Sequence, residues 1–150
     1  MQLRVETSEE MEELGTKLAG LLRLGDVLLL SGELGAGKTT LTRGLGAALE
    51  VEGTIQSPTF VLAREHRIPA GGKFVHVDAY RLSSALELDD LDINFSGSIV
   101  VIEWARDFLD GSLESYLSLD IDRTSEDEVR TVTLTMTGER WQGVDFASFN

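Results

Sequence analysis

The stretch that most constrains the fold is a glycine-rich loop between an aliphatic run and a segment of helical composition. Residues 25–31 (GDVLLLS) form a continuous apolar run, which is typical of a buried central strand. Residues 32–39 (GELGAGKT) match the pattern G-x-x-x-x-G-K-[ST] at every fixed position, and residues 38–50 follow as a predicted helix. Because this pattern occurs between a strand and a helix, the sequence predicts an α/β sheet built around the loop.

The loop has the residue types that hold a phosphate chain. Glycines let the backbone turn so that several N–H groups point at one anion, and the start of the following helix adds further donors. The Lys38 ammonium would contact the β and γ phosphates, and the Thr39 hydroxyl is placed to bind Mg²⁺. The alternative is a glycine turn with an incidental Lys-Thr pair, which would not need the flanking strand and helix. The predicted nucleotide-binding residues are Glu33, Leu34, Gly35, Ala36, Gly37, Lys38, Thr39 and Thr40.

Two acidic residues are candidates to complete such a site. Glu103 closes the apolar run in residues 98–104, and Asp78 lies in the predicted strand 73–81. In an open α/β sheet the carboxyl ends of the strands lie beside the loop, so either acid could serve Mg²⁺ or orient an attacking water. We predict that both are catalytic and that Glu103 shares the metal ion with Thr39. The alternative for Glu103 is a glutamate that merely ends a strand in solvent.

Two further groups of polar residues each have two possible roles. Strand alternation places His76 and Tyr80 on the face of Asp78, where His76 is either chemically active or a hydrogen-bonded core residue. Ser57 and Thr59, in the segment SPTF, could cap a turn or sense the γ-phosphate.

The flanking segments predict one mixed domain over residues 1–150. Residues 2–6 alternate as an edge strand, and Thr7 with Glu10 forms a T-x-x-E capping box for the helix that follows. The apolar stripe of that helix is expected to pack into the core. Its members are Met11, Leu14, Leu18, Leu21 and Leu22.

The remaining segments complete the predicted sheet. Residues 68–73 (IPAGGK) indicate a hairpin turn, and residues 83–92 indicate a short acidic helix capped by Ser83 or Ser84. Residues 116–122 and 128–136 alternate as two antiparallel strands late in the chain. We therefore expect a P-loop NTPase fold, with a mixed, mostly parallel sheet flanked by helices.

Composition excludes several classes of protein. The 150 residues suit one core, 42% of them are hydrophobic, and no apolar run is long enough to cross a bilayer. The chain has no cysteine, which excludes a disulfide framework, and its N-terminus lacks the features of a secretion signal. We expect a cytoplasmic protein. Its 26 acidic and 13 basic residues give a formal charge of −13, which disfavours direct binding of nucleic acid.

Four segments in this order resemble the TsaE (YjeE) family, the ATPases of bacterial tRNA threonylcarbamoyladenosine biosynthesis. They are GELGAGKTT, SPTF, HVDAYRL and VIEW, which lie within residues 31–104. The phosphate loop is generic, whereas SPTF followed by H-x-D-x-Y-R-L and IEW is far more specific.

The resemblance implies an ATPase that works with two partner subunits, a carbamoyltransferase-like catalytic subunit and its paralogous companion. Together they attach a threonylcarbamoyl group to adenosine beside the anticodon of tRNA. The family member hydrolyses ATP to reset the complex between turnovers and meets tRNA only indirectly, with no membrane involved.

The resemblance also implies roles for single residues. Lys38 and Thr39 would hold phosphate and Mg²⁺, Glu103 and Asp78 would serve the metal ion or its water, and Trp104 would lie close to the nucleotide. Many members have a proline where this chain has an alanine at position 105, which affects only the loop after Trp104.

Three other functions share the phosphate loop. A small-molecule kinase needs an acceptor-binding region and a lid, for which no segment is long enough. A GTP switch would need the motifs N-K-x-D and D-x-x-G, which the sequence lacks, and a module that binds nucleotide without hydrolysing it stays open. Slow turnover by the chain alone is expected, because Arg43, Arg81 and Arg106 are only candidates for an arginine finger.

Overall fold

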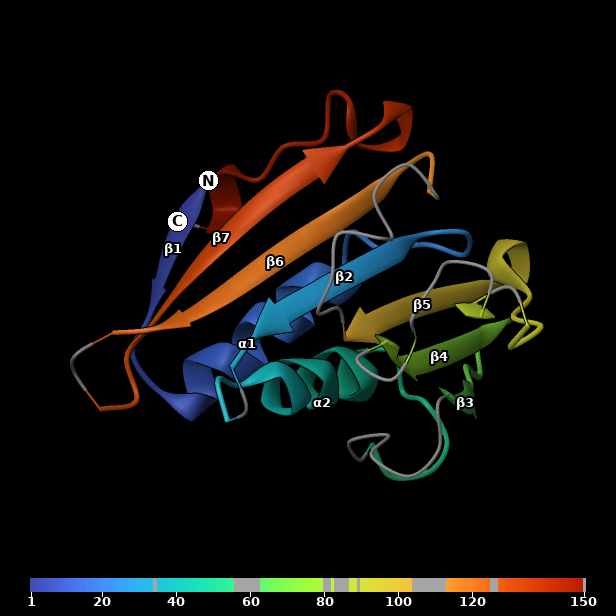
Figure 1. The fold of residues 1–150 in the computed structure, drawn as a ribbon, viewed down its shortest axis with the longest axis horizontal. Coiled ribbons are helices and arrows are strands. Elements are labelled where there is room, and N and C mark those ends of the chain that lie inside the picture. Colours follow the sequence, from blue (N-terminus) through green and yellow to red (C-terminus); the bar gives the residue numbers. More distant parts are fainter. Residues whose placement is uncertain are drawn as a thin grey trace.

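The chain folds around one seven-stranded β-sheet, seen in the computed structural model shown in Figure 1. The structure describes residues 1–33, 35–55, 63–79, 82, 87–88, 90–103, 113–124 and 127–149. Its elements in chain order are β1 (Gln2–Val5), α1 (Ser8–Ala19), β2 (Val27–Gly32), α2 (Lys38–Ala48), β3 (Ala63–Arg67), β4 (Lys73–Asp78), η2 (Phe95–Gly97), β5 (Ser98–Glu103), β6 (Tyr116–Arg123), β7 (Arg130–Thr137), η4 (Glu139–Trp141) and η5 (Ala147–Phe149).

The sheet is mixed, as the sequence predicts. Its strand order is β1-β7-β6-β2-β5-β4-β3. The central strands β6, β2, β5 and β4 are mutually parallel. The pairs β1–β7, β6–β7 and β3–β4 are antiparallel. The predicted edge strand therefore lies outside the parallel centre, whereas the hairpin β3–β4 and the late antiparallel pair β6–β7 each share one strand with it.

The two most apolar runs of the sequence form adjacent strands at that centre. All six residues of β5 are buried, as are the first four of β2. Strands covered on both faces need apolar side chains pointing both ways, which explains why these runs are continuous rather than alternating. The loop after β2 is therefore carried by a strand that is held on both sides.

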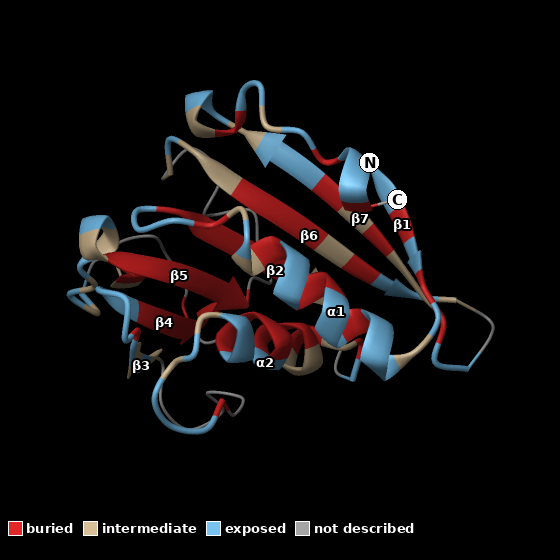
Figure 2. Ribbon diagram, turned by 180° about the vertical axis from the view of Figure 1, so that it is seen from behind, coloured by how far each residue is buried: buried red, intermediate tan, exposed pale blue. Residues whose placement is uncertain are grey.

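Helices α1 and α2 pack against each other on one face of the sheet (Figure 2). They cross closely at Gly44, where an added Cβ would lie 2.1 Å from the carbonyl oxygen of Glu12. Leu18, Leu41 and Leu30 belong to the core cluster on this face, and a second cluster covers the opposite face. In the described part of the chain both predicted helices thus lie on a single face.

The start of α1 follows the predicted capping box with one difference. Thr7 Oγ1 accepts a hydrogen bond from the Glu10 amide (3.1 Å), as expected of an N-cap. The Glu10 carboxylate accepts from the amide of Glu6, one residue before the position that a capping box uses. The helix ends at Ala19, so Leu21 and Leu22 continue the predicted stripe beyond it, half-buried and buried respectively.

The other predicted helices differ in their ends or in their coverage. Helix α2 ends at Ala48 rather than at residue 50, because Glu50 has a positive φ of 57°, outside the helical region. The predicted acidic helix 83–92 falls largely on residues that the structure does not describe. Among the helices of the described residues, none is long and apolar enough to cross a membrane.

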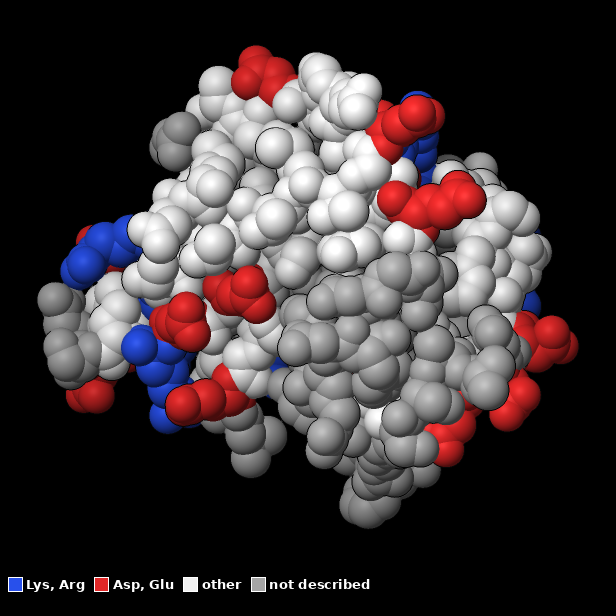
Figure 3. Space-filling view, turned by 45° about the horizontal axis from the view of Figure 1, so that its top comes forward, with Lys and Arg blue, Asp and Glu red and all other residues white. Residues whose placement is uncertain are grey.

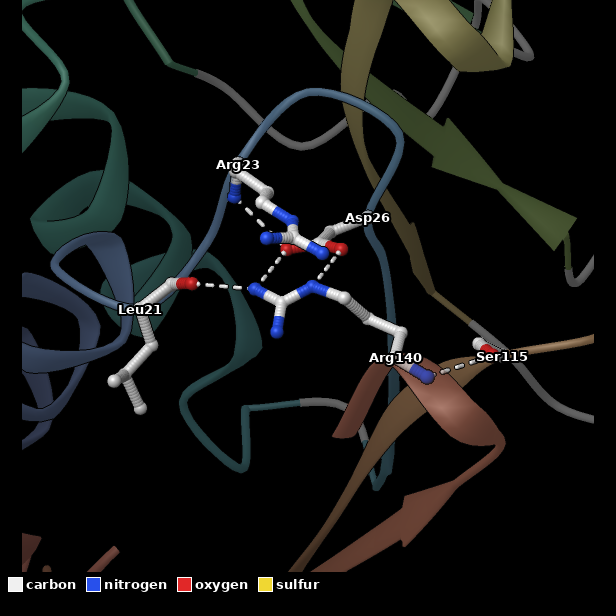
Figure 4. A network of polar contacts seen from close by, with 5 residues as sticks. All are labelled: Leu21, Arg23, Asp26, Ser115 and Arg140. Atoms are coloured by element: carbon white, nitrogen blue, oxygen red, sulfur yellow. Dashed lines mark hydrogen bonds and ion pairs between the residues drawn. The ribbon is translucent and has the colours of Figure 1, made fainter. Parts of the chain in front are cut away.

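A buried ion pair ties the C-terminal segment to the start of β2 (Figure 4). The Arg140 guanidinium donates through Nε to Asp26 Oδ1 (2.8 Å) and through Nη2 to Asp26 Oδ2 (2.9 Å). The same Nη2 donates to the carbonyl of Leu21, and the Arg23 amide donates to Asp26 Oδ2, both at 2.8 Å. The guanidinium also stacks on Trp141, 4.2 Å from its ring centre. This network closes the end of the sheet that lies away from the glycine loop.

Candidate nucleotide site

The glycine loop lies between the carboxyl end of β2 and the amino end of α2, as predicted. Gly37 is the N-cap of α2 and has a left-handed backbone, with φ of 117°. Gly35 also has a positive φ, of 80°. Such values strain any residue with a side chain, so the two glycines produce the turn that directs this loop into the helix.

The loop lysine is turned inward. Its Nζ donates to the carbonyl oxygen of Gly32 at 2.6 Å, and the residue is buried. Thr39 and Thr40 follow as the next residues of α2 and are partly accessible, and Glu33 is exposed. The ammonium is therefore positioned at the mouth of the loop, where a phosphate would meet it.

Two arginines from the β6–β7 pair support the loop, and no local pattern of the sequence predicted them there. Arg130 Nε donates to the carbonyl of Ala36 at 3.1 Å. The Arg123 guanidinium packs on Gly35, since an added Cβ would lie 2.5 Å from its Nη2. The alternating pattern of residues 116–136 predicted both strands but not which loop their ends would approach.

A cavity of about 170 Å³ opens beside the loop. Its walls come from the loop itself, the start of α1 and the β6–β7 end of the sheet. Thr7, Thr40, Glu128 and Arg130 supply polar groups to it, and Met11 an apolar one. The cavity therefore offers both apolar and hydrogen-bonding contacts next to the expected phosphate position.

The two predicted carboxylates lie side by side at the carboxyl ends of neighbouring parallel strands. Asp78 ends β4 and Glu103 ends β5, and the two residues are paired in the sheet register. Glu103 is also paired with Leu30 of β2, two residues before the end of that strand. Both acids are buried, at 8% and 6% exposure. Glu103 is therefore not a strand end in solvent, which removes that alternative.

His76 lies two residues before Asp78 in β4, on the same face of the sheet, and contacts Glu103. Its Nε2 is 3.3 Å from Glu103 Oε1, and the residue has no exposed surface. Phe74 and Val101, which belong to the core cluster beneath the helices, lie on the same face of these strands. The histidine thus links the Glu103 carboxylate to the core.

Several predicted site residues lie outside the described residues. They are Leu34, Ser57, Thr59, Tyr80, Arg81, Trp104 and Arg106. Arg43 is described, and its Nε donates to the carbonyl of Ile55 at 3.4 Å. Within the described ranges no group of three or more His, Asp or Glu side chains is arranged to hold a metal ion by itself.

Comparison with known proteins agrees with this arrangement. Residues 5–132 match the family described as "Threonylcarbamoyl adenosine biosynthesis protein TsaE". The chain is 54% identical over 142 residues to the tRNA threonylcarbamoyladenosine biosynthesis protein TsaE of Streptomyces coelicolor, covering 90% of this chain and 96% of that protein. The chain belongs to the TsaE family.

More distant TsaE proteins and a solved structure extend the match. The TsaE of Bacillus subtilis is 33% identical over 146 residues, covering 95% of this chain and 89% of its own. The crystal structure of YdiB from Bacillus subtilis superimposes with a TM-score of 0.76 at 30% identity, covering 94% of this chain and 88% of that one. The region matched to the TsaE family contains the loop, both carboxylates and both supporting arginines.

Proposed function

We propose that this TsaE family member is a Mg²⁺-dependent ATPase that serves threonylcarbamoyl modification of adenosine next to the anticodon of tRNA. Its hydrolysis of ATP resets a complex formed with a carbamoyltransferase-like catalytic subunit and the paralogous companion of that subunit. The observation that carries the proposal is the meeting of a phosphate loop with two buried carboxylates at one edge of the sheet. The names of the relatives supply the pathway.

The loop residues divide the binding of ATP between them. The backbone N–H groups at the start of α2 and the Lys38 ammonium hold the phosphates, because the N-terminus of a helix has free donors and a positive dipole end. The cavity beside Thr40 receives the nucleoside half, whose flat base suits a wall such as Met11. Trp104 is expected close to the nucleotide as well.

The chemistry of the donor set fits Mg²⁺. This ion usually takes one or two protein oxygens and fills its other positions with water and substrate phosphates. The Thr39 hydroxyl and the Glu103 carboxylate are such a pair, and a larger protein cluster is not needed. When bound, Mg²⁺ would neutralise charge that develops on the phosphate oxygens.

Asp78 and Glu103 have the second task of orienting the attacking water. Both carboxylates accept hydrogen bonds and lie at the edge where the γ-phosphate would end. Arg123 and Arg130 hold the loop from the opposite side and are new candidates to stabilise charge on the phosphates. Turnover by the chain alone is expected to be slow.

The charge distribution supports indirect contact with tRNA. On the face shown in Figure 3, acidic side chains are scattered over several places, and basic side chains lie mainly at the left with others at the upper right and the right margin, beside acidic neighbours. A broad basic surface for a phosphate backbone is not seen on this face. Contact with tRNA through partner subunits needs no such surface.

The test is hydrolysis of ATP with and without the two partner subunits, using the full chain. We expect release of free phosphate that needs Mg²⁺, is slow for the chain alone and rises when both partners are present. Lys38→Ala should weaken nucleotide binding, and Glu103→Ala should retain binding but lose hydrolysis. Transfer of the γ-phosphate to a metabolite, or modification activity unchanged in Glu103→Ala, would contradict the proposal.

A further inference from the structure

His76 is the most deeply buried polar side chain near the two carboxylates. It lies within β4, and its side chain has no contact with solvent. Nε2 lies 3.3 Å from Glu103 Oε1, and Nδ1 has no hydrogen-bond partner among the described residues. The contact with Glu103 is thus the one hydrogen bond of this imidazole in the described part of the chain.

The Glu103 carboxylate determines which imidazole nitrogen of His76 carries the hydrogen. An ionised carboxylate only accepts hydrogen bonds, so His76 Nε2 must be the donor in this pair. The buried Nδ1 is then left with a lone pair, which costs less than a buried N–H without an acceptor. The geometry therefore favours the imidazole with its hydrogen on Nε2.

The second histidine of the chain has the opposite arrangement. Its Nδ1 lies 2.9 Å from the carbonyl oxygen of Glu52, which can only accept. His66 must therefore carry its hydrogen on Nδ1. It lies on the edge strand β3, away from the loop, and is a matched control for His76.

A histidine kept only for packing would not need this partner. Phe74 and Val101 beside His76 on this face are apolar, whereas Asp78 and the register partner Arg64 are charged. An aliphatic side chain would pack against the two apolar neighbours without burying a polar ring. The single hydrogen bond instead restrains one oxygen of a carboxylate whose other oxygen has no side-chain hydrogen bond among the described residues. This leaves the other oxygen for a ligand.

We infer that His76 is a positioning residue for Glu103. Its Nε2–H donates to Oε1 and fixes the rotamer of the carboxylate, so that Oε2 meets the metal ion or the attacking water in one orientation. This inference rests on the proposed function for its effect on catalysis, but not for the hydrogen bond itself. Hydrogen bonds of this kind are often long without substrate and tighten in the complex.

The first test measures the hydrogen bond directly. In ¹⁵N NMR spectra of the imidazoles of the full chain, His76 is expected as the Nε2–H form and His66 as the Nδ1–H form. His66→Gln assigns the signals, because the chain has only two histidines. Glu103→Ala should shift the His76 resonances and leave those of His66 unchanged. An Nδ1–H form of His76, or no shift in Glu103→Ala, overturns the inference.

The second test measures the effect on the site. Removing a partner that orients a metal-binding group typically costs about 10- to 100-fold in metal affinity or activity. We expect His76→Leu to raise the Mg²⁺ concentration needed for tight binding of a fluorescent ADP by about 10-fold. Binding of the same probe without Mg²⁺ should be unchanged, and kcat should fall more than KM rises.

Conservative variants separate positioning from packing. His76→Gln retains an N–H donor near the position of Nε2 and should recover most of the lost Mg²⁺ dependence, while His66→Leu should have no effect. Equal behaviour of His76→Leu and the parent chain would overturn the inference, as would equal loss in His76→Leu and His76→Gln when both are folded. If the parent chain with its partners hydrolysed no ATP, the proposed function would fail, whereas the NMR and Mg²⁺-binding tests would still decide the role of His76.

Discussion

Two buried carboxylates lie at opposite ends of the central strands and differ in how many hydrogen bonds they accept among the described residues. Asp26, just before β2, accepts three hydrogen bonds, two from Arg140 and one from the Arg23 amide. Among the described residues Glu103, at the far end of β5, accepts one long hydrogen bond, from His76. Both carboxylates are almost fully buried, at 4% and 6% exposure.

The difference separates a carboxylate held by an ion pair from one that we propose is available to a ligand. Burying a charge is costly unless hydrogen bonds and an opposite charge replace the lost water. Asp26 has both, because Arg140 approaches it with two donors in one plane. Glu103 has neither in full, which is the expected condition of a group whose remaining partners arrive with the substrate. The predictions below test this contrast.

The largest effect is expected for the ion pair of Asp26 with Arg140. Arg140→Ala would leave Asp26 buried without a counter-charge, and losing one partner of a buried pair costs about 3 kcal/mol or more. We expect that decrease in the free energy of unfolding, measured by urea denaturation. Arg4→Ala removes an arginine from an exposed pair with Glu6 and should cost less than about 1 kcal/mol. Similar losses in the two variants would contradict the contrast.

The next effect concerns the end of the sheet that carries the glycine loop. It should change the affinity for ATP rather than the free energy of unfolding. Lys38→Ala removes the charged donor expected at the phosphates, worth about 1.5–3 kcal/mol. The affinity for ATP should therefore fall by about 10- to 100-fold, as measured by titration with a fluorescent analogue. Lys73→Ala, which removes an exposed lysine paired with Glu65, should bind like the parent chain. Arg140→Ala, assayed where it is folded, should also bind normally.

Much of the fold could be predicted because its centre is encoded locally. The apolar runs in β2 and β5, the capping residue Thr7 and the alternation of β6 and β7 each determine an element from neighbouring residues. The strand order and the packing of both described helices on one face depend on contacts between distant segments, which no local pattern specifies.

The site shows the same division. The glycine pattern predicted the loop, and strand-end positions predicted that Asp78 and Glu103 would lie together. The approach of Arg130 to Ala36 could not be predicted, because the two residues are 94 positions apart in the sequence. The contact of His76 with Glu103 needed the register of β4 on β5, which decides which side chains face each other across the strands.

Removing the charge of either carboxylate should also change the free energy of unfolding. The change should have opposite signs for Glu103 and Asp26. Glu103→Gln removes a buried charge with little compensation, so the free energy of unfolding should rise by about 1 kcal/mol. Asp26→Asn should lower it, because the ion pair with Arg140 is lost. Urea denaturation of both variants under one condition checks the two signs. A decrease in Glu103→Gln as large as in Asp26→Asn would mean that Glu103 stabilises the fold.

The smallest effect is expected for an exposed pair on α1, which shows how far burial decides these energies. Lys17 Nζ lies 4.0 Å from Glu13 Oε1, one helical turn away, and both side chains are exposed. Pairs of this kind contribute about 0.3–0.5 kcal/mol, because water and salt screen them. Lys17→Ala should lower the free energy of unfolding by no more than this, and the difference should vanish in high salt. The loss in Arg140→Ala should persist in the same salt, since water and ions do not reach Asp26. If both losses vanished together, the buried pair would be open to solvent, and the contrast between the two ends of the sheet would rest on strand position alone.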